Sequence, residues 1–264
     1  MNLLVPERRD EPEWMDRDDV PAPSIEAVLR EIAWVNRRLG GARVLLEAID
    51  PFLEAAPPDE IFEILDVGTG GGDLASAMID HGRHRGRRVR VTAIDRDPAA
   101  AAFAARSAPD GLRVVRADAA ALPFPDQSFD LVTASLFLHH FRHREAAALL
   151  AAFRRLARRA VIINDLERHR LPWVFINLVG RATRRSPMFL HDAPLSVLRG
   201  FTQPELLALA RDAGAPESTV QRSWPFRLLL VLPPDAPPAR GHLSYGQPPA
   251  QEPGSRGHGA DSVP

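Results

Sequence analysis

The stretch "EILDVGTGGGDL", residues 63–74, decides the fold of this chain. It begins with an apolar run, and an acid stands on each side of the loop that follows, Asp66 and Asp73. Between these acids lie four glycines: Gly68, Gly70, Gly71 and Gly72. Glycine allows left-handed turns and lets a ligand approach the backbone closely. A strand that ends in such a loop and leads into a helix predicts a ligand site at the carboxyl edge of an open parallel sheet.

Outward from this loop, strands alternate with helices. Apolar strands are predicted at "RVRVTAID" (88–95), "LRVVRAD" (112–118), "SFDLVTASLFL" (128–138) and "RAVIIND" (159–165). Such alternation indicates a parallel sheet covered by helices on both faces. The last two strands, "STVQRSW" (218–224) and "FRLLLVL" (226–232), are separated only by a proline-containing bend. The sequence therefore predicts an α/β, doubly wound, mostly parallel seven-stranded sheet with an antiparallel C-terminal hairpin.

The flanking segments divide the chain further. Residues 1–23 are acidic and contain prolines, which predicts an extended or flexible segment, and 24–58 predict a cap of two helices with Ser24 as the first N-cap. The predicted ligand-binding domain is 59–232. Within it, 166–200 is predicted as an irregular insertion that folds over the site as a lid. Residues 233–264, rich in proline and glycine, predict a disordered tail.

Composition excludes several kinds of chemistry. All 33 basic residues are arginines and there is no cysteine, so lysine Schiff bases, a P-loop lysine, disulfides and thiolate metal sites are ruled out. A net charge of −1 gives no reason to expect a nucleic-acid partner. No apolar stretch is long enough to span a membrane, and the N-terminus has no signal-like apolar core, which predicts a cytoplasmic protein. His81, His84 and His143 lie among arginines, which disfavours a bound cation, and no metal site is predicted.

The two acids of the loop limit what it can hold. A dinucleotide site requires a third glycine where this chain has Asp73, and two carboxylates would repel a pyrophosphate. They would instead favour a ligand with a positive, amino-acid-like group, such as S-adenosylmethionine (SAM). Asp95 ends the next strand at the distance where an acid meets ribose hydroxyls. Asp118 ends the third strand, where it and the amide of Ala119 are expected to meet the adenine edge.

Four motifs carry a family resemblance: "ILDVGTGGG", "AIDRD", "RADAAALPFPDQSFDLV" and "SLFLHHF". In order and spacing they resemble those of class I SAM-dependent methyltransferases with a Rossmann-like fold, over about residues 60–232. The small-molecule group that includes ubiquinone- and menaquinone-type enzymes is the most similar. The flanks "PEWMD", "NRRLGG" and "HDAPLSVLRGFT" look like bacterial methyltransferases of polyketide and phenolic-lipid pathways.

The resemblance implies roles for further residues. The methionine part of SAM would contact Asp66, Gly68, Thr69 and Gly70, and Arg96 would lie on the adenine face. Ala134 and Ser135 would line the site after the fourth strand.

Two histidine-containing motifs are candidates for the reacting end. His139 of "LFLHHF" is predicted to be the base or the residue that orients the acceptor, with His140 structural; alternatively, both cap the helix that follows. A second candidate is His191 beside Asp192, where the carboxylate would raise the histidine pKa, unless this is a surface loop. Asn164 and Asp165 are further pocket candidates. The apolar "LPWVFINLVG" (171–180) suits the wall of a site for a hydrophobic or aromatic acceptor.

The resulting hypothesis is a SAM-dependent methyltransferase that acts on a hydroxyl of a small phenolic, quinone-like or polyketide acceptor. C-methylation of a quinone-type ring and a non-catalytic SAM-binding accessory protein remain alternatives. An NAD-dependent oxidoreductase shares the fold, but Asp73 and the lack of a Tyr-x-x-x-Lys pair count against it. Nucleic-acid or protein methylation is disfavoured because no basic cleft is evident. A homodimer is left open.

Overall fold

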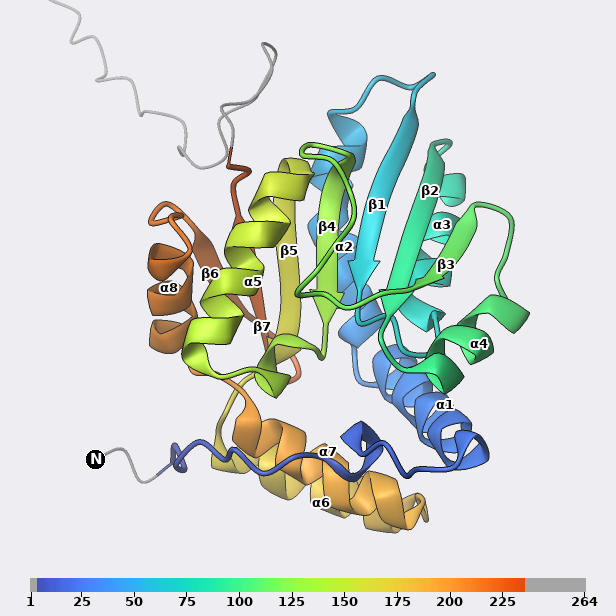
Figure 1. The fold of residues 1–264 in the computed structure, drawn as a ribbon. Coiled ribbons are helices and arrows are strands. Elements are labelled where there is room, and N and C mark those ends of the chain that lie inside the picture. The colour runs from blue at the N-terminus through green and yellow to red at the C-terminus, as the bar shows by residue number, and fades with distance from the viewer. Residues whose placement is uncertain (1–3, 236–264) are drawn as a thin grey trace, which may run out of the picture.

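The computed structural model describes residues 4–235 of the chain. Within this range, seven strands form one sheet in the order β3-β2-β1-β4-β5-β7-β6 (Figure 1). The strands are β1 (Ile61–Val67), β2 (Arg88–Asp95), β3 (Leu112–Arg116), β4 (Phe129–Ser135), β5 (Ala157–Leu166), β6 (Thr219–Ser223) and β7 (Arg227–Leu232). Strands β1 to β5 run parallel, whereas β7 pairs antiparallel with both β5 and β6. The predicted doubly wound sheet and its C-terminal hairpin are confirmed.

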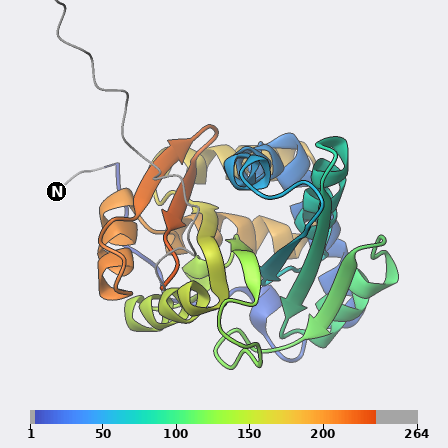
Figure 2. The same cartoon turned by 90° about the horizontal axis from the view of Figure 1, so that it is seen from above.

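Helices cover both faces of the sheet (Figures 1 and 2). On one face, α5 (His143–Leu156) and α8 (Gln203–Asp212) share an apolar core with the inner strands. On the other face, α2 (Gly41–Glu54) and α3 (Asp73–His84) form a second core. All seven residues of β4 are buried, as expected for a central strand covered on both sides. The continuous apolar runs of the sequence are therefore explained by burial on two faces.

The carboxyl edge of the sheet is covered by a separate group of elements. Here α1 (Ala22–Arg38) packs against α4 (Pro98–Arg106), and α6 (Arg170–Ala182) packs against α7 (Pro187–Arg199). Two short 3-10 helices, η1 (Trp14–Asp16) and η2 (Leu138–His140), lie next to α7. The first residues of the chain cross in front of α7 before they enter α1 (Figure 1). These elements enclose the edge at which the glycine loop ends.

The structure corrects the predicted conformation of residues 166–200. They are not irregular, because most of them form α6 and α7. Ser186 caps α7 by accepting a hydrogen bond from the Phe189 amide, and Pro187 occupies the first turn. Pro172 likewise lies in the first turn of α6, where its missing N–H has no intrahelical partner to lose. Both prolines are therefore compatible with the start of a helix.

Smaller local predictions divide in the same way. The sequence also predicts a capping box at Thr202 and Glu205 and a C′ glycine at Gly214. The structure has this capping box at the start of α8, and Gly214 follows the helix with a φ of 77°. Asp97 caps α4 by accepting from the Ala100 amide at 2.7 Å. Ser24 is not an N-cap, because α1 begins at Ala22, after Pro21.

The predicted tail lies outside the described residues from position 236 onward. Among the helices of the described range, none is long and apolar enough to cross a bilayer.

Candidate active site

The glycine loop between β1 and α3 is shaped by its backbone angles. Gly68, Gly70 and Gly72 all have positive φ, a conformation that side chains disfavour. A Cβ on Gly68 would lie 2.2 Å from the ring of Phe137, which is closer than atoms can approach. The amide of Thr69 donates to the carbonyl of Ile94 at the end of β2, at 2.9 Å. The loop is therefore held tightly against the sheet edge with its backbone exposed to a ligand.

Two buried carboxylates organise this loop. Asp66 accepts hydrogen bonds from the hydroxyls of Thr69 at 2.7 Å and Thr133 at 2.9 Å. Burial raises the pKa of Asp66 to about 6. Asp95 accepts from the amides of Gly70 at 2.8 Å and Asp97 at 3.0 Å, and burial also raises its pKa. Both carboxylates favour a positive group nearby, since cationic charge would lower their pKa values again.

A single cavity of about 700 Å³ joins the glycine loop to the motif "LFLHHF". Most of the predicted cofactor residues line it: Asp66, Gly68, Thr69, Gly70, Asp95, Arg96, Asp118, Ala119 and Ser135. Ala134 does not line the cavity, because it is fully buried within the sheet. Asp118 is exposed and accepts from the amide of Ala120 at 2.9 Å. At the other end, Phe175, Ile176 and Phe189 form an apolar wall, in agreement with the predicted role of residues 171–180.

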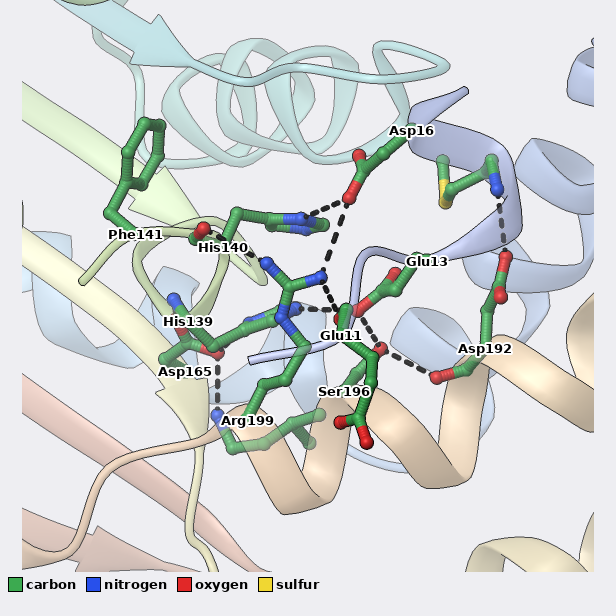
Figure 3. Close-up of polar contacts among 12 residues, drawn as sticks. Glu11, Glu13, Asp16, His139, His140, Phe141, Asp165, Asp192, Ser196 and Arg199 are labelled. Carbon is green, nitrogen blue, oxygen red and sulfur yellow. Dashed lines mark hydrogen bonds and ion pairs between the residues drawn. The ribbon is translucent and has the colours of Figure 1, made fainter. Parts of the chain in front are cut away.

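His139 lies at the inner end of the cavity and is 2% exposed (Figure 3). Its Nδ1 is 2.7 Å from Oδ1 of Asp165, at the end of β5, and its amide donates to Oδ2 of the same carboxylate. Its Nε2 lies 3.4 Å from Oε1 of Glu13 and has no hydrogen-bond partner among residues 4–235. Burial acts to lower the pKa of His139, but the charges of Asp165 and Glu13 outweigh it and raise this pKa to about 9. The two carboxylates therefore favour the protonated form of His139, whose Nε2 faces Glu13.

Glu13 was not predicted from the sequence. It belongs to residues 4–20, which we call the N-terminal strap. Glu13 is 2% exposed and accepts from the hydroxyl of Ser196 at 2.8 Å. Burial acts to raise the pKa of Glu13, but its contacts with His139 and His140 outweigh burial and leave the pKa below its usual value. Asp16, also on the strap, has its Oδ2 within hydrogen-bond distance of Nδ1 of His140, at 2.9 Å. The strap thus supplies two carboxylates to the histidine pair.

Contacts along its whole length hold the strap in place. Arg8 donates to the carbonyls of His139 at 3.0 Å and Phe141 at 2.9 Å. Arg199 donates to the carbonyl of Glu11 (Figure 3). Arg168 donates to the carbonyl of Pro6. The strap has no regular element other than η1, and arginines pin it across the cavity rather than leaving it free. The charged "PEWMD" segment gave no hint of this burial, because acids in a proline-containing terminus usually face solvent.

The second histidine candidate has a different setting. Both carboxylate oxygens of Asp192 accept from strap amides, Oδ1 from Trp14 at 2.8 Å and Oδ2 from Met15 at 3.0 Å. His191 hydrogen-bonds to Asp192 and stacks on Trp14, with ring centroids 4.1 Å apart. Asp192 lines the cavity but His191 does not. This geometry favours a role for the pair in anchoring the strap, while the predicted catalytic role stays a prediction.

Glu13, His139 and His140 each offer one ligand atom, and these atoms lie within 4.8 Å of one another. Such a group is able to hold a metal ion. Ion pairing accounts for the same approach, because a buried imidazolium requires the neighbouring carboxylates. We therefore assign no metal to this group.

Arg227, at the start of β7, is a second residue that the sequence analysis missed. It is 2% exposed and lines the cavity. Its Nη2 donates to Oδ1 of Asn36 at 3.3 Å, and Asn36 in turn donates to Asp73 at 3.1 Å. Burial lowers the pKa of Arg227 to about 10. Within the described part of the chain, no carboxylate pairs with it and its Nη1 has no partner. The sequence did contain a signal for this buried residue, because Arg227 is the one charged residue in the apolar run "FRLLLVL".

Further unpartnered atoms lie on the strands beside Arg227. Ser135 and Asn164 are register partners on β4 and β5, and Leu166 pairs with Arg227 two residues further on. Neither the hydroxyl of Ser135 nor Oδ1 of Asn164 has a partner among the residues described. Buried polar atoms are rarely left without hydrogen bonds. Ser135, which lines the cavity, and Arg227 therefore mark a place for a polar ligand group.

The sheet order, the glycine loop and the acids at the ends of β1, β2 and β3 are the features in which this chain resembles class I, SAM-dependent methyltransferases. Comparison with known proteins agrees: residues 64–160 match the methyltransferase domain family. The unpartnered Nη1 of Arg227 and the unpartnered hydroxyl of Ser135 fit the amino-acid end of SAM.

Among curated proteins, the chain is similar to demethylmenaquinone methyltransferase of Thermus thermophilus, with 41% identity over 103 residues. This match covers 38% of the chain and 43% of that relative, so the chain spans less than half of the relative's length. What the relative acts on therefore bears on this chain only as a proposal.

Solved structures show the same fold at low identity. The CMeT domain of the citrinin polyketide synthase is 13% identical with a TM-score of 0.56, covering 74% of this chain and 52% of that one. The DszA carbon methyltransferase is 16% identical with a TM-score of 0.55, covering 76% and 55%.

Proposed function

We propose that this protein transfers a methyl group from SAM to a hydroxyl of a small phenolic, quinone-like or polyketide acceptor. The observation that carries the proposal is the single cavity that joins the glycine loop to His139. One end offers acids and exposed backbone, and the other offers a protonated histidine beside an apolar wall. A nucleoside cofactor and a hydrophobic acceptor can meet only in a cavity that is continuous between the two.

At the cofactor end, Asp95 has one hydrogen bond on each carboxylate oxygen and retains capacity for ribose hydroxyls. Asp118 and Ala119 are assigned to the adenine edge and Arg96 to its face. Asp66, Gly68, Thr69 and Gly70 hold the methionine part, and Ser135 lines it. SAM, when bound there, supplies a methyl group on a positively charged sulfur.

We assign the carboxylate of the methionine part to Arg227. A buried guanidinium without a paired carboxylate is costly, and an anionic ligand group removes that cost. Asp66 and Asp73 lie near the same end of the cavity and favour the α-ammonium group. Acids on one side and an arginine on the other match the two charges of an amino acid.

At the acceptor end, His139 orients the hydroxyl. Its Nε2 faces Glu13 at 3.4 Å without a hydrogen bond and is the donor assigned to the acceptor, and Asp165 fixes the ring through Nδ1. A hydrogen bond from an imidazolium lowers the pKa of a bound phenol and stabilises the oxygen charge needed for attack. The neighbouring carboxylate of Glu13 is placed to take the released proton. Bound SAM would supply the methyl group to this phenolic oxygen, and the electron pair of the broken carbon–sulfur bond would stay on sulfur.

Activity with a panel of catechols, hydroquinones and resorcinols tests this proposal. His139→Gln is expected to reduce kcat by about 10²- to 10⁴-fold, the usual effect of a positioned acid–base group, with little change in product-nucleoside affinity. His143→Gln is the matched control, because His143 is exposed and pairs with Asp212 on the surface. Normal turnover by the His139 variant would contradict the assignment.

C-methylation of a quinone-type ring is the second candidate, and the similarity to a demethylmenaquinone methyltransferase favours it. The same hydrogen bond to a ring hydroxyl would increase electron density at the neighbouring carbon. Nuclear magnetic resonance of the methylated product distinguishes the two, since O-methyl and ring C-methyl protons have separate shifts.

A further inference from the structure

Helix α6 presents apolar side chains to solvent. Leu171 is 58% exposed, Val174 45% and Leu178 61%, and Trp173 between them is 39% exposed. Leu171, Val174 and Leu178 follow one another at the spacing of a single helix face. On the opposite side of α6, Pro172, Phe175 and Ile176 line the cavity. One short helix therefore separates the acceptor end of the cavity from an exposed apolar surface.

The turn between β6 and β7 extends this surface. Trp224 there is 73% exposed, the largest exposure among the big apolar residues described. Its ring lies 5.3 Å from that of Phe226, which lies 5.7 Å from Phe175 of α6. Phe226 and Phe175 both line the cavity. We call the set Leu171, Trp173, Val174, Leu178 and Trp224 the apolar face.

The segment of the chain that carries α6 holds charge of one sign. Residues 168–191 contain five arginines and neither Asp nor Glu, in a chain whose net charge is −1. Arg170 begins α6, Arg181 lies in its last turn and Arg184 follows it, and all three are exposed. Basic residues beside an exposed apolar helix face are the combination that binds anionic lipid surfaces.

We propose that the apolar face docks on an anionic lipid surface and that a lipophilic acceptor enters the cavity from it. The second clause rests on the proposed function, since it names the acceptor of that same cavity. At 13 residues α6 is too short to span a bilayer and suits a helix lying in the interface. Trp173 and Trp224 have the amphipathic rings that are enriched at this depth.

A second copy of the chain fits this face less well than lipid does. In a two-fold dimer the same patch meets itself, so Arg170, Arg181 and Arg184 of both copies would lie opposite one another. Such like charges oppose association, whereas anionic headgroups neutralise them.

Cosedimentation of the full chain with vesicles tests the proposal. We expect binding to vesicles of equal parts phosphatidylcholine and phosphatidylglycerol, weakened by salt, and much weaker binding to phosphatidylcholine alone. The double variants Leu171→Glu/Leu178→Glu and Arg181→Glu/Arg184→Glu should each lower the partition coefficient by about tenfold or more. Ile61→Glu is the matched control, because Ile61 is also exposed but begins β1 at the opposite edge of the sheet.

Several results would overturn the proposal: no binding to the anionic vesicles, equal binding to neutral ones, or wild-type binding by both double variants. A dimer in light scattering that Leu171→Glu/Leu178→Glu dissociates would assign the face to a second copy instead. Calorimetry with S-adenosylhomocysteine on the same variants separates the two proposals. If the wild type does not bind S-adenosylhomocysteine, the proposed function is refuted. If it binds S-adenosylhomocysteine but not the vesicles, only the docking surface is refuted.

Discussion

At the scale of single residues, the charge on His139 links stability to pH. The pKa of His139 is raised from 6.5 to about 9, so the folded state binds a proton more tightly than the unfolded state. The stabilisation is complete below pH 6.5 and is lost as pH rises through about 9; its full size is roughly 3 kcal/mol. Urea unfolding at pH 6.5 and 9.5 should show this loss in the wild type and a flatter profile in His139→Gln. If the free energy of unfolding changes equally with pH in both proteins, the raised pKa of His139 is refuted.

Gly68 is predicted to tolerate no side chain. Gly68→Ala combines the strain of a positive φ with a Cβ 2.2 Å from Phe137. Gly86→Ala is the control, since Gly86 has a φ of 67° but nothing within 4 Å of a Cβ. The control should lose about 1 kcal/mol of unfolding free energy, and Gly68→Ala clearly more, together with nucleoside affinity. Similar losses in both variants would mean that the contact with Phe137 is easily relieved.

Arg227 is predicted to recognise the carboxylate of the cofactor. Arg227→Met should weaken S-adenosylhomocysteine by about 10- to 100-fold, the worth of a charge-assisted hydrogen bond. Affinity for 5′-methylthioadenosine, which lacks the amino-acid group, should not change. Arg222→Met serves as control, because Arg222 lies on the same hairpin but pairs with Glu167 at the surface. An equal loss for both nucleosides would indicate a structural role for Arg227.

Among the elements, the N-terminal strap is held by Asp192. Asp192→Ala removes the acceptor of two backbone amides, which should cost about 1–3 kcal/mol of unfolding free energy. Because the strap carries Glu13, we also expect a higher acceptor KM with little change in nucleoside affinity. Asp212→Ala, at an exposed ion pair, is the control. An unchanged acceptor KM would separate the strap from the acceptor site.

Element prediction from sequence succeeded where one local pattern decides the outcome. The strand–glycine loop–helix unit and the capping box at Thr202 are set by residues within a few positions of one another. The strap, α6 and α7 depend on partners far along the chain. Glu13 is buried by Ser196 and His139, and Arg8 is fixed by carbonyls more than a hundred residues away. From composition alone, the strap was predicted to be extended and the segment of α6 and α7 to be irregular.

For the whole molecule, the cofactor half of the site was predictable and the acceptor half was not. Asp66, Asp95 and Asp118 follow strands, and parallel strands bring their carboxyl ends to one edge. The acceptor half is assembled from the strap, η2, α6 and α7, whose relative positions no spacing in the sequence encodes. His139 was found because it follows β4, whereas its partner Glu13 required the three-dimensional structure.

The most direct test is calorimetric titration of the full chain with S-adenosylhomocysteine, with NADH as the comparison. The account predicts micromolar binding of S-adenosylhomocysteine and none of NADH. It also predicts weaker S-adenosylhomocysteine binding as pH falls below about 6, because protonation of Asp66 removes a charge that favours the ammonium group. Binding of NADH alone, or of neither ligand by protein shown to be folded, would contradict the assignment of this cavity to SAM.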